Sequence, residues 1–425
     1  MKKRYYFLGI CGISMATLAI FLKNKGNFVQ GSDRQIGKTA IILKQDGIDI
    51  DTKLNRKNIQ KAAVVVCSSA IKDDNPQKIY AKKLNKKIVS RGEILGDISK
   101  QYQTVIAIAG SHGKTTTTAL VYEILKTAGK NPTLHLGGYR IEDGCNFHIG
   151  DKEFFVTEAC EYCDNFLFLH PKISVITNIE KEHMDYFKTF ERQIESFKKF
   201  ESQSQCVINS LNGYSAENIF HSDFGGLNFS IFKNNEKIMD VCMQIFEEVN
   251  VFNVIYAYQV AKKLGISDDV CKKAFENFKG VETRFQKVSC SYFDSVFCDY
   301  AHHPTEISKT IETANKIFKG RQIVFIFQPH TFSRTKTLLS EFINSLSKTE
   351  NLILFKTYSA REKPSEGVSA YKLSKILKEC GKKVSYYAKT ESLCKKLKRL
   401  NKQCVIVFVG AGDLQMELNK RGFIS

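Results

Sequence analysis

Two kinds of apolar pattern alternate along the whole chain. Short runs rich in β-branched and aromatic residues, each ending at a glycine or a polar turn, are typical of buried strands. Between them, apolar residues recur at helical spacing, as in residues 13–24 and 251–264. The strand-like runs cover residues 4–10, 28–30, 62–67, 105–109, 154–156, 173–176, 295–299, 321–327, 351–355 and 404–409. Strands that alternate with helices favour an α/β fold with mostly parallel sheets.

The pattern falls into three blocks, each of which opens with a strand that leads into a glycine or polar turn. We therefore predict three α/β domains, at residues 1–102, 103–286 and 287–425. A chain of 425 residues with 43% hydrophobic residues is long enough to form two or three cores of ordinary size.

The chain has thirteen cysteines, which would indicate disulfides in a short secreted protein. This chain is long and the number is odd, so we expect reduced core residues of a cytoplasmic protein. Four that lie in or beside strand-like runs are Cys67, Cys206, Cys298 and Cys404. Cys160 and Cys163 have a spacing seen in metal sites, but no matching second pair accompanies them, which argues against zinc.

The formal net charge of +19 raises the question of nucleic-acid binding. The lysines are spread along the chain without an arginine-rich block or interleaved aromatic residues, so we expect no nucleic-acid partner. A basic surface also suits small anionic substrates.

The N-terminal segment has a basic start and an apolar stretch to residue 22, as a signal peptide or membrane anchor would. Gly9 and Gly12 divide the stretch, however, and no cleavage-site pattern follows it. We interpret it as a strand, a turn and a helix, and expect no membrane insertion.

The run at residues 105–109 leads directly into Gly-Ser-His-Gly-Lys-Thr-Thr and then into a helical pattern. In this strand, loop and helix order, backbone N–H groups and a helix N-terminus face a phosphate. Lys114 would reach the terminal phosphates, and the Thr115 hydroxyl would bind Mg²⁺. The usual motif has glycine where this chain has Ile108, and a chance Gly-Lys-Thr is the alternative. The flanking elements favour a nucleotide site formed by Gly110, Ser111, His112, Gly113, Lys114, Thr115 and Thr116.

The first block has a weaker signal at residues 9–14, Gly-Ile-Cys-Gly-Ile-Ser. Cys11 and Ser14 replace two glycines of the dinucleotide fingerprint, so a plain tight turn explains the segment nearly as well. Asp33 follows the second strand, where an acid can accept hydrogen bonds from a ribose. Ser68 and Ser69 follow the run 62–67, at the sheet edge where open α/β sheets bind ligands.

Acidic and histidine residues also follow strands in the second block. Glu158 lies just after the run 154–156, and His183 lies in the segment after the run 173–176. A carboxylate and an imidazole could converge beside the phosphate loop and hold Mg²⁺. Taken singly, an exposed acid and an ordinary loop histidine would be the simpler interpretation.

In the third block, Asp-Tyr-Ala-His-His-Pro-Thr-Glu follows one strand, and Gln-Pro-His-Thr-Phe-Ser-Arg-Thr follows the next. A solvated turn with Thr305 as a helix cap would explain the first of these segments. Adjacent histidines and an acid at a strand end favour a binding site instead.

Together these motifs resemble the Mur ligases, ATP-dependent enzymes that build the peptide of bacterial peptidoglycan precursors. The loop at 110–116 resembles their shortened phosphate loop, and segments 158–161 and 178–185 resemble their Glu-Ala-x-Glu and Asn-Ile-x-x-x-His-x-Asp patterns. The two third-block segments are close to verbatim matches to the member that adds L-alanine. Because these motifs occur in order in all three blocks, the resemblance covers the whole chain. It implies a Rossmann-like UDP-binding domain, a P-loop ATPase-like central domain and a Rossmann-like C-terminal domain.

The resemblance also implies roles for individual residues. The sugar nucleotide would be bound by Gly9, Gly12, Ser32, Asp33, Ser68, Ser69, His303, His330 and Arg334. ATP would be bound by the phosphate loop with Asn253, Arg284, Asp299 and Tyr300, where Asn253 is all that remains of a longer family pattern. Mg²⁺ would be held by Thr115, Glu158 and His183. The catalytic set would be Lys114, Glu158, His183, Arg284, His330 and Arg334.

The implied reaction joins L-alanine to the lactyl carboxylate of UDP-N-acetylmuramate through an acyl phosphate, with ATP and Mg²⁺. Two alternatives remain at this stage. One is a recycling ligase that attaches a tripeptide to the same sugar nucleotide. The other is a non-catalytic protein that binds UDP-sugars and regulates a partner.

Overall fold

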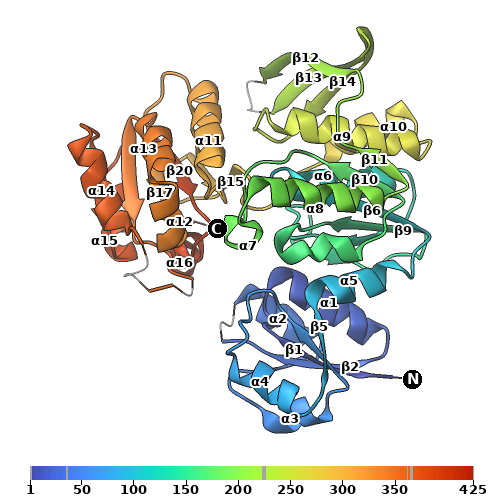
Figure 1. Ribbon diagram of the computed structural model, residues 1–425. Helices are drawn as coiled ribbons and strands as arrows, with labels where there is room; N and C mark the ends of the chain where they lie inside the picture. Colours follow the sequence, from blue (N-terminus) through green and yellow to red (C-terminus); the bar gives the residue numbers. More distant parts are fainter. Residues whose placement is uncertain (1, 35–36, 223–225, 361, 364–366, 425) are drawn as a thin grey trace. The chain divides into compact units, whose positions relative to one another are not determined.

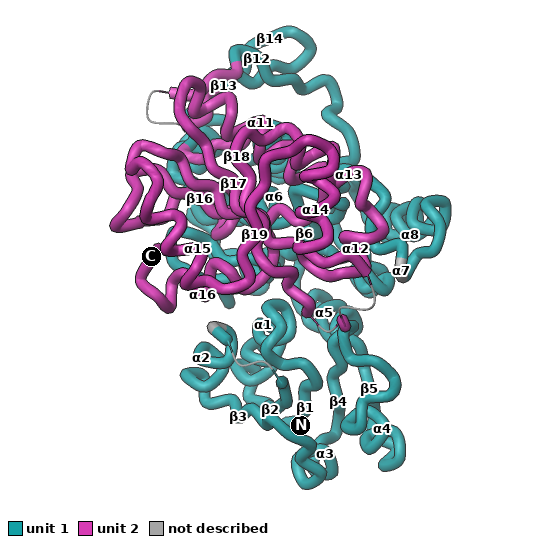
Figure 2. The backbone as a smooth tube through the Cα atoms, turned by 90° about the vertical axis from the view of Figure 1, so that its left-hand side faces the viewer, with its two compact units in different colours: residues 1–218, 229–243, 249–279 teal, residues 219–228, 244–248, 280–425 magenta. Residues whose placement is uncertain are grey.

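A computed structural model describes residues 2–34, 37–222, 226–360, 362–363 and 367–424. The chain divides into two compact units (Figure 2). The first unit holds residues 1–218, 229–243 and 249–279, and the second holds residues 219–228, 244–248 and 280–425.

The first unit opens with a parallel five-stranded sheet of order β3-β2-β1-β4-β5. Its strands are β1 (Arg4–Leu8), β2 (Phe28–Ser32), β3 (Asp49–Asp51), β4 (Val64–Cys67) and β5 (Lys87–Ser90). Its helices are α1 (Ile13–Asn24), α2 (Lys38–Gln45), α3 (Arg56–Lys61), α4 (Pro76–Lys83) and α5 (Arg91–Ser99). The strands predicted at 4–10, 28–30 and 62–67 and the helix predicted at 13–24 are confirmed. Every residue of β4 is buried, as expected of a parallel strand covered on both faces.

A six-stranded sheet of order β11-β10-β6-β9-β7-β8 follows in the same unit. Its strands are β6 (Thr104–Ala109), β7 (Thr133–His135), β8 (Phe147–His148), β9 (Phe154–Glu158), β10 (Ile173–Ile176) and β11 (Cys206–Ile208). The strand β8 pairs antiparallel with β7, and the other neighbours are parallel. The strand before the predicted phosphate loop, β6, is central and buried throughout. The loop therefore follows a central strand that is buried on both faces.

Helices and short helical turns surround this second sheet. They are α6 (Lys114–Thr127), the 3₁₀ segment η1 (Tyr162–Phe168), α7 (Met184–Phe187), α8 (Phe190–Ser202), α9 (Asn250–Lys263) and α10 (Asp268–Asn277). Both α9 and α10 pack against α6 (Figure 1). A small sheet of order β12-β13-β14 comprises β12 (Tyr214–His221), β13 (Leu227–Lys233) and β14 (Glu236–Met243).

One apolar core joins the two larger sheets of the first unit. It runs from α1 through Tyr102 to β9, with the rings of Tyr102 and Phe155 stacked at a centroid distance of 5.0 Å. Phe166 on η1 stacks on Phe200 of α8 at 4.8 Å. Burial of these large aromatic side chains holds the first sheet against the second, because each ring removes a large apolar area from water.

The second unit contains a six-stranded sheet of order β15-β16-β20-β17-β18-β19. Its strands are β15 (Gln286–Val288), β16 (Ser295–Asp299), β17 (Ile323–Phe327), β18 (Asn351–Phe355), β19 (Val384–Tyr387) and β20 (Val405–Val409). Its helices are α11 (Pro304–Ile317), α12 (Phe332–Thr337), α13 (Leu339–Ser347), α14 (Ala370–Glu379), α15 (Thr390–Leu397) and α16 (Leu414–Lys420). The edge strand β15 is antiparallel to β16, and the remaining pairs are parallel. The architecture confirms the predicted α/β class with mostly parallel sheets.

Alternate residues of these strands fill two cores, one on each face of the sheet. Phe297 belongs to one core, whereas its neighbours Val296 and Cys298 belong to the other. This is the period-two arrangement expected of a strand that is covered on both sides.

The predicted domain boundaries at 102/103 and 286/287 stay predictions, and the strand β15 spans the second of them. All thirteen cysteines are described, and none forms a disulfide. Cys67, Cys298 and Cys404 are buried, whereas Cys206 is half-buried. Within the described part of the chain, every helix is too short or too polar to cross a bilayer.

Candidate active site

The glycine turn of the first sheet lies where β1, β2 and β4 end side by side. The Ser32 carbonyl accepts hydrogen bonds from the N–H groups of Gly9 and Ile10, at 2.8 and 3.1 Å. Gly9 has a φ of +80°, which favours glycine. Asp33 accepts a hydrogen bond from the Cys11 N–H at 3.0 Å, so one carboxylate oxygen holds the turn closed.

The remaining predicted sugar-nucleotide residues of this sheet lie at the same edge. Ser68 follows β4 and donates its N–H to the Leu8 carbonyl at 3.1 Å. The Ser69 hydroxyl accepts a hydrogen bond from Asn165 at 3.1 Å. Gly12 is the N-cap of α1, so the open end of a helix faces this edge. The fold thus brings Gly9, Gly12, Ser32, Asp33, Ser68 and Ser69 together.

Two glycines shape the loop between β6 and α6. Gly110 and Gly113 have φ angles of +127° and +84°, in the region that side chains other than glycine rarely adopt. A Cβ on Gly110 would lie 2.2 Å from the Thr177 hydroxyl oxygen. The chain therefore needs glycine at both positions to turn from the strand into the helix N-terminus.

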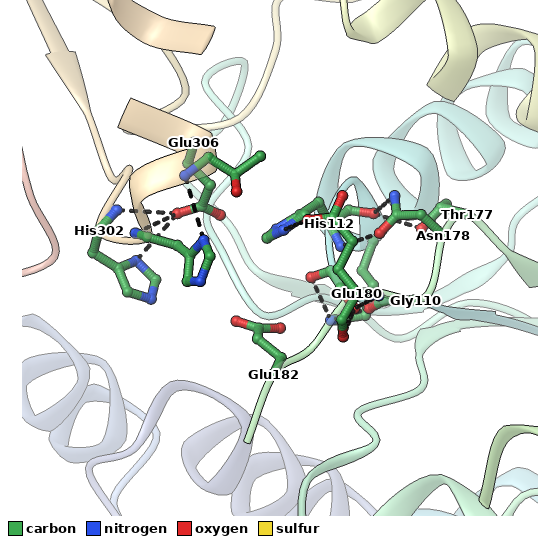
Figure 3. Close-up of polar contacts among 12 residues, drawn as sticks. Gly110, His112, Thr177, Asn178, Glu180, Glu182, His302 and Glu306 are labelled. Atoms are coloured by element: carbon green, nitrogen blue, oxygen red, sulfur yellow. Dashed lines mark hydrogen bonds and ion pairs between the residues drawn. The ribbon is translucent and has the colours of Figure 1, made fainter. Parts of the chain in front are cut away.

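The loop is held by the segment that follows β10 (Figure 3). Ser111 donates its N–H to the Asn178 carbonyl at 3.0 Å, and His112 donates its N–H to the Asn178 side-chain oxygen at 2.9 Å. The His112 ring lies 3.4 Å from a carboxylate oxygen of Glu180. The Thr177 hydroxyl donates to the His112 carbonyl. These contacts hold the loop backbone against the segment after β10.

Lys114 begins α6 and folds back over the loop. Its ammonium group donates to the carbonyls of Gly110 and Ser111, the latter at 3.1 Å, and forms an ion pair with Glu161 at 3.3 Å. Burial alone would lower the pKa of Lys114, but the carboxylates of Glu161, Glu182 and Glu158 outweigh it and raise the pKa above its ordinary value. The side chain is therefore a permanent cation at the loop.

An acidic cluster lies beside this cation. Glu161 is fully buried, and one of its oxygens lies 3.7 Å from Nε2 of His183. Potential ligand atoms of Glu161, Glu182 and His183 all lie within 4.8 Å of one another. His183 stacks at 4.7 Å on Tyr162, and its backbone has a φ of +55°. Positive φ at a non-glycine residue is uncommon and is often found at functional sites.

The sequence pointed to Glu158 and His183, and the structure adds Glu161 and Glu182 to the histidine. Glu158 ends β9 and accepts the Gly137 N–H at 2.6 Å. It is outside the three-residue cluster found among the described residues. Glu161 is the second acid of the Glu-Ala-x-Glu segment and Glu182 directly precedes His183. The place of Glu161 in that motif and the place of Glu182 beside His183 are the sequence signals that could have identified these two acids.

The remaining nucleotide candidates of the first unit line the start of α6. Asn253 of α9 accepts a hydrogen bond from Thr117 at 3.2 Å and donates to Asn250 at 2.9 Å. A Cβ on Gly113 would lie 2.4 Å from its side-chain oxygen, so Asn253 packs directly behind the loop. Thr115 and Thr116 occupy the first turn of the helix, with Thr115 half-buried and Thr116 buried.

In the second unit, Asp299 ends β16 and holds the backbone of two segments. Its carboxylate accepts the N–H groups of Phe285 and Ala301, at 3.1 and 2.7 Å. Burial raises the pKa of Asp299 to about 6, against the opposing effect of nearby Arg284. The Arg284 guanidinium lies over the Tyr300 ring, 5.7 Å from its centroid. The structure thus brings Arg284, Asp299 and Tyr300 together, and their predicted role in binding ATP stays a prediction.

The adjacent histidines open α11. Glu306 accepts the N–H groups of His302 and His303, at 3.0 and 3.2 Å (Figure 3). The His303 ring in turn accepts the Thr305 N–H, so His303 is the helix cap and Thr305 lies inside the helix. Burial lowers the pKa of His302 to about 4, so this ring is neutral near pH 7.

His330 and Arg334 follow β17. Nη1 of Arg334 lies 3.4 Å from Nδ1 of His330, and the His330 ring lies 5.8 Å from that of His302. Burial, reinforced by Arg334, lowers the pKa of His330 to about 4. Glu362 accepts the N–H groups of Phe332 and Ser333, at 2.7 and 2.9 Å, and so fixes the start of α12. A neutral histidine and a half-buried guanidinium suit an anionic, carboxylate-bearing ligand.

Three models of known protein families match successive segments of the chain. Residues 4–103 match the Mur ligase family catalytic domain, and residues 108–219 match the Mur ligase middle domain. Residues 283–412 match the glutamate ligase domain of the Mur ligases.

Curated relatives are similar over nearly the whole length. The UDP-N-acetylmuramate–L-alanine ligase of Caldicellulosiruptor bescii is 40% identical over 97% of this chain and 96% of its own length. That of Clostridium acetobutylicum is 36% identical over 97% of this chain and 96% of its own.

Solved structures agree with the sequence comparison. The UDP-N-acetylmuramate–alanine ligase from Thermotoga maritima has a TM-score of 0.85 and 26% identity, over 98% of both chains. A murein peptide ligase from Psychrobacter arcticus shares the fold, with a TM-score of 0.71 and 21% identity over 98% of both chains. The glycine turn, the phosphate loop with its lysine and the histidine segments of the second unit are thus parts of a known architecture, and the chain belongs to the Mur ligase family.

Proposed function

We propose that this protein is an ATP-dependent ligase that joins L-alanine to the lactyl carboxylate of UDP-N-acetylmuramate. The products are UDP-N-acetylmuramoyl-L-alanine, ADP and phosphate. The observation that carries the proposal is the phosphate loop, where Lys114 is tied to two loop carbonyls beside the Glu161–His183 cluster. The relatives named for this reaction match the chain along nearly its full length.

The proposed reaction has two steps. The lactyl carboxylate attacks the γ-phosphorus of ATP, the bond from that phosphorus to the bridging oxygen breaks, and ADP leaves. The amine of L-alanine then attacks the carbonyl carbon of the acyl phosphate, loses a proton and expels phosphate. Lys114 carries a fixed positive charge that offsets negative charge on the transferring phosphoryl group. We assign the same kind of role to Arg284 of the second unit.

The residues beside the loop fit a divalent cation. Glu161 is fully buried, and its Oε2 has no hydrogen-bond partner among the described residues beyond the ion pair with Lys114 at 3.3 Å. Carboxylate oxygens, a hydroxyl and an imidazole nitrogen form a reasonable donor set for Mg²⁺. We propose Thr115, Glu158 and His183 as ligands, with Glu161 and Glu182 close enough to His183 to contribute. When bound, Mg²⁺ would neutralise phosphate oxygens of ATP.

The domain assignment is part of the same proposal. Residues 1–102 would bind the uridine diphosphate sugar at the edge formed by Gly9, Gly12, Ser32, Asp33, Ser68 and Ser69. Residues 103–286 would bind ATP through the phosphate loop and Asn253. Residues 287–425 would contribute Asp299 and Tyr300 to the ATP site, and His303, His330 and Arg334 to the sites for the sugar carboxylate and the amino acid.

A phosphate-release assay with UDP-N-acetylmuramate and ATP tests the reaction. We expect release with L-alanine and little release with the tripeptide of peptidoglycan or without an amine. Turnover with the tripeptide alone would instead identify a recycling ligase. Binding of the UDP-sugar with no ATP consumption under any condition would identify a non-catalytic protein.

His183→Ala should raise the Mg²⁺ concentration needed for half-maximal activity by about tenfold or more, because an inner ligand is lost. Excess Mg²⁺ should restore part of the rate. His170→Ala, which removes an exposed histidine of the same unit, is the matched control. A Mg²⁺ titration with the wild-type midpoint for His183→Ala would show that this histidine is not a ligand.

A further inference from the structure

A buried histidine outside the predicted site lies between the two larger sheets of the first unit. His135 ends β7 and is only 3% exposed. Its Nε2 lies 2.8 Å from the hydroxyl of Ser14, at the start of α1. Its Nδ1 lies 2.9 Å from the hydroxyl of Thr157, the residue before Glu158 on β9. One ring therefore contacts both the glycine turn of the first sheet and the end of β9.

The hydrogen atoms of this chain of contacts have one consistent arrangement. The Thr157 hydroxyl donates to the Glu158 carbonyl at 3.0 Å, so it must accept from Nδ1–H of His135. Burial lowers the pKa of His135 to about 3, which keeps the ring neutral. Nε2 then has no proton and accepts from the Ser14 hydroxyl. Ser14 in turn accepts a hydrogen bond from Nη1 of Arg91 at 3.1 Å.

Both ends of this chain reach groups that the proposed function uses. Ser14 follows Gly12, the N-cap of the helix that faces the sugar-nucleotide edge. At the other end, Thr157 adjoins Glu158, and Gly137, two residues after His135, donates its N–H to the Glu158 carboxylate at 2.6 Å. The segment 135–137 therefore reaches Glu158 in two ways. His135 reaches its backbone carbonyl through the Thr157 hydroxyl, and Gly137 binds its carboxylate directly.

We propose that His135 is a positioning residue that couples occupancy of the sugar-nucleotide turn to the placement of Glu158 at the metal and ATP site. The proposal rests on the function proposed above. Both ring nitrogens of His135 are hydrogen-bonded and the ring is buried, so it has no alternative partner to turn to. A ligand that shifts Ser14 or Arg91 should therefore shift the His135 ring as well. If this hydrogen-bond chain couples the two sites, breaking any one of its links should abolish the coupling, and this can be tested.

The experiment measures UDP-N-acetylmuramate binding by calorimetry, with and without ADP and Mg²⁺. The wild-type protein should show an affinity change of about fivefold or more, the lower end of typical coupling between sites. His135→Asn keeps a polar group near the Nδ1 position, and His135→Gln keeps one near the Nε2 position, so each preserves only one link. Both variants, and Thr157→Val, should reduce the affinity change to less than twofold.

Ser14→Ala is the variant least expected to disturb folding, because Ser14 is only half-buried. It should show the same loss of coupling. Thr17→Val is the matched control, since it removes a buried contact of 2.9 Å from Asn146 to the same helix but leaves every link of the Ser14–His135–Thr157 chain in place. In Thr17→Val, ADP and Mg²⁺ should change the affinity for UDP-N-acetylmuramate as much as in the wild-type protein. We expect this variant to differ only in a lower melting temperature.

Three outcomes would overturn the proposal: no coupling in the wild-type protein, wild-type coupling in Thr157→Val and Ser14→Ala, or equal loss in Thr17→Val. Failure of the proposed function is separate, because it would appear as a wild-type protein that forms no alanine adduct. A protein that ligates L-alanine but couples normally without the Ser14 and Thr157 hydroxyls would contradict the role of His135 alone.

Discussion

Lys114→Ala should lower the rate of ligation by about a thousandfold or more, on the scale measured when a charge that stabilises a transferring phosphoryl group is removed. The ammonium group lies at the N-terminus of α6, where the loop carbonyls of Gly110 and Ser111 hold it in place. A preorganised charge of this kind needs no rearrangement when the transition state forms, which is why its loss affects the rate so strongly.

The same substitution should also lower stability, and this effect must be separated from catalysis. Glu161 is fully buried and pairs with Lys114, so the variant leaves a buried carboxylate without its cation. Leaving a buried charged group without its partner costs on the order of 3–5 kcal/mol. The assay therefore belongs well below the melting temperature of the variant, with thermal melts and ATP calorimetry run alongside.

Lys126→Ala is the matched control, because Lys126 is on the same helix and forms an exposed ion pair with Glu142. It should leave turnover unchanged. If Lys114→Ala were folded at the assay temperature and turned over substrate near the wild-type rate, the phosphate-loop assignment would be wrong.

The sequence predicted the strands and helices that are long or uniformly apolar. The run at residues 173–176 matches β10, and β6 and β4 are buried throughout, so their patterns are unambiguous. The short edge strands β3 and β5 were not predicted, because Asp49–Asp51 and Lys87–Ser90 mix charged and apolar residues. The strand β12 was missed for a related reason, since half of its residues are exposed and none is buried. Such strands depend on pairing with a neighbour more than on their own pattern.

The candidate site was predicted where a motif and a strand end coincide, as at Lys114. The motif predicts that Lys114 reaches a phosphate, and the structure adds the buried Glu161 as its partner, which only the fold brings near. His135 carries no local signal, because a single histidine in a short apolar strand is compatible with an ordinary core position. Its partners Ser14 and Thr157 are 121 and 22 residues away in the chain. Contacts of that range are invisible to periodicity and spacing.

Arg334→Lys should lower the rate of alanine transfer by about a hundredfold, the typical cost of losing the orientation of a reacting group. A guanidinium can bind a carboxylate through two parallel hydrogen bonds, whereas an ammonium binds it as a point charge. Arg334 is suited to this role because Glu362 fixes the start of its short helix and Nη1 lies 3.4 Å from His330. The His330 ring is neutral near pH 7, so it does not compete with Arg334 for an anion.

Steady-state kinetics with each substrate varied in turn would locate the defect. We expect the loss in the use of UDP-N-acetylmuramate or L-alanine, with the affinity for ATP nearly unchanged and the melting temperature close to that of the wild-type protein. Arg399→Lys, at an exposed position of the same unit, is the matched control and should have no effect. Wild-type turnover in Arg334→Lys, or a defect confined to ATP binding, would show that this guanidinium does not bind the sugar carboxylate or the amino acid.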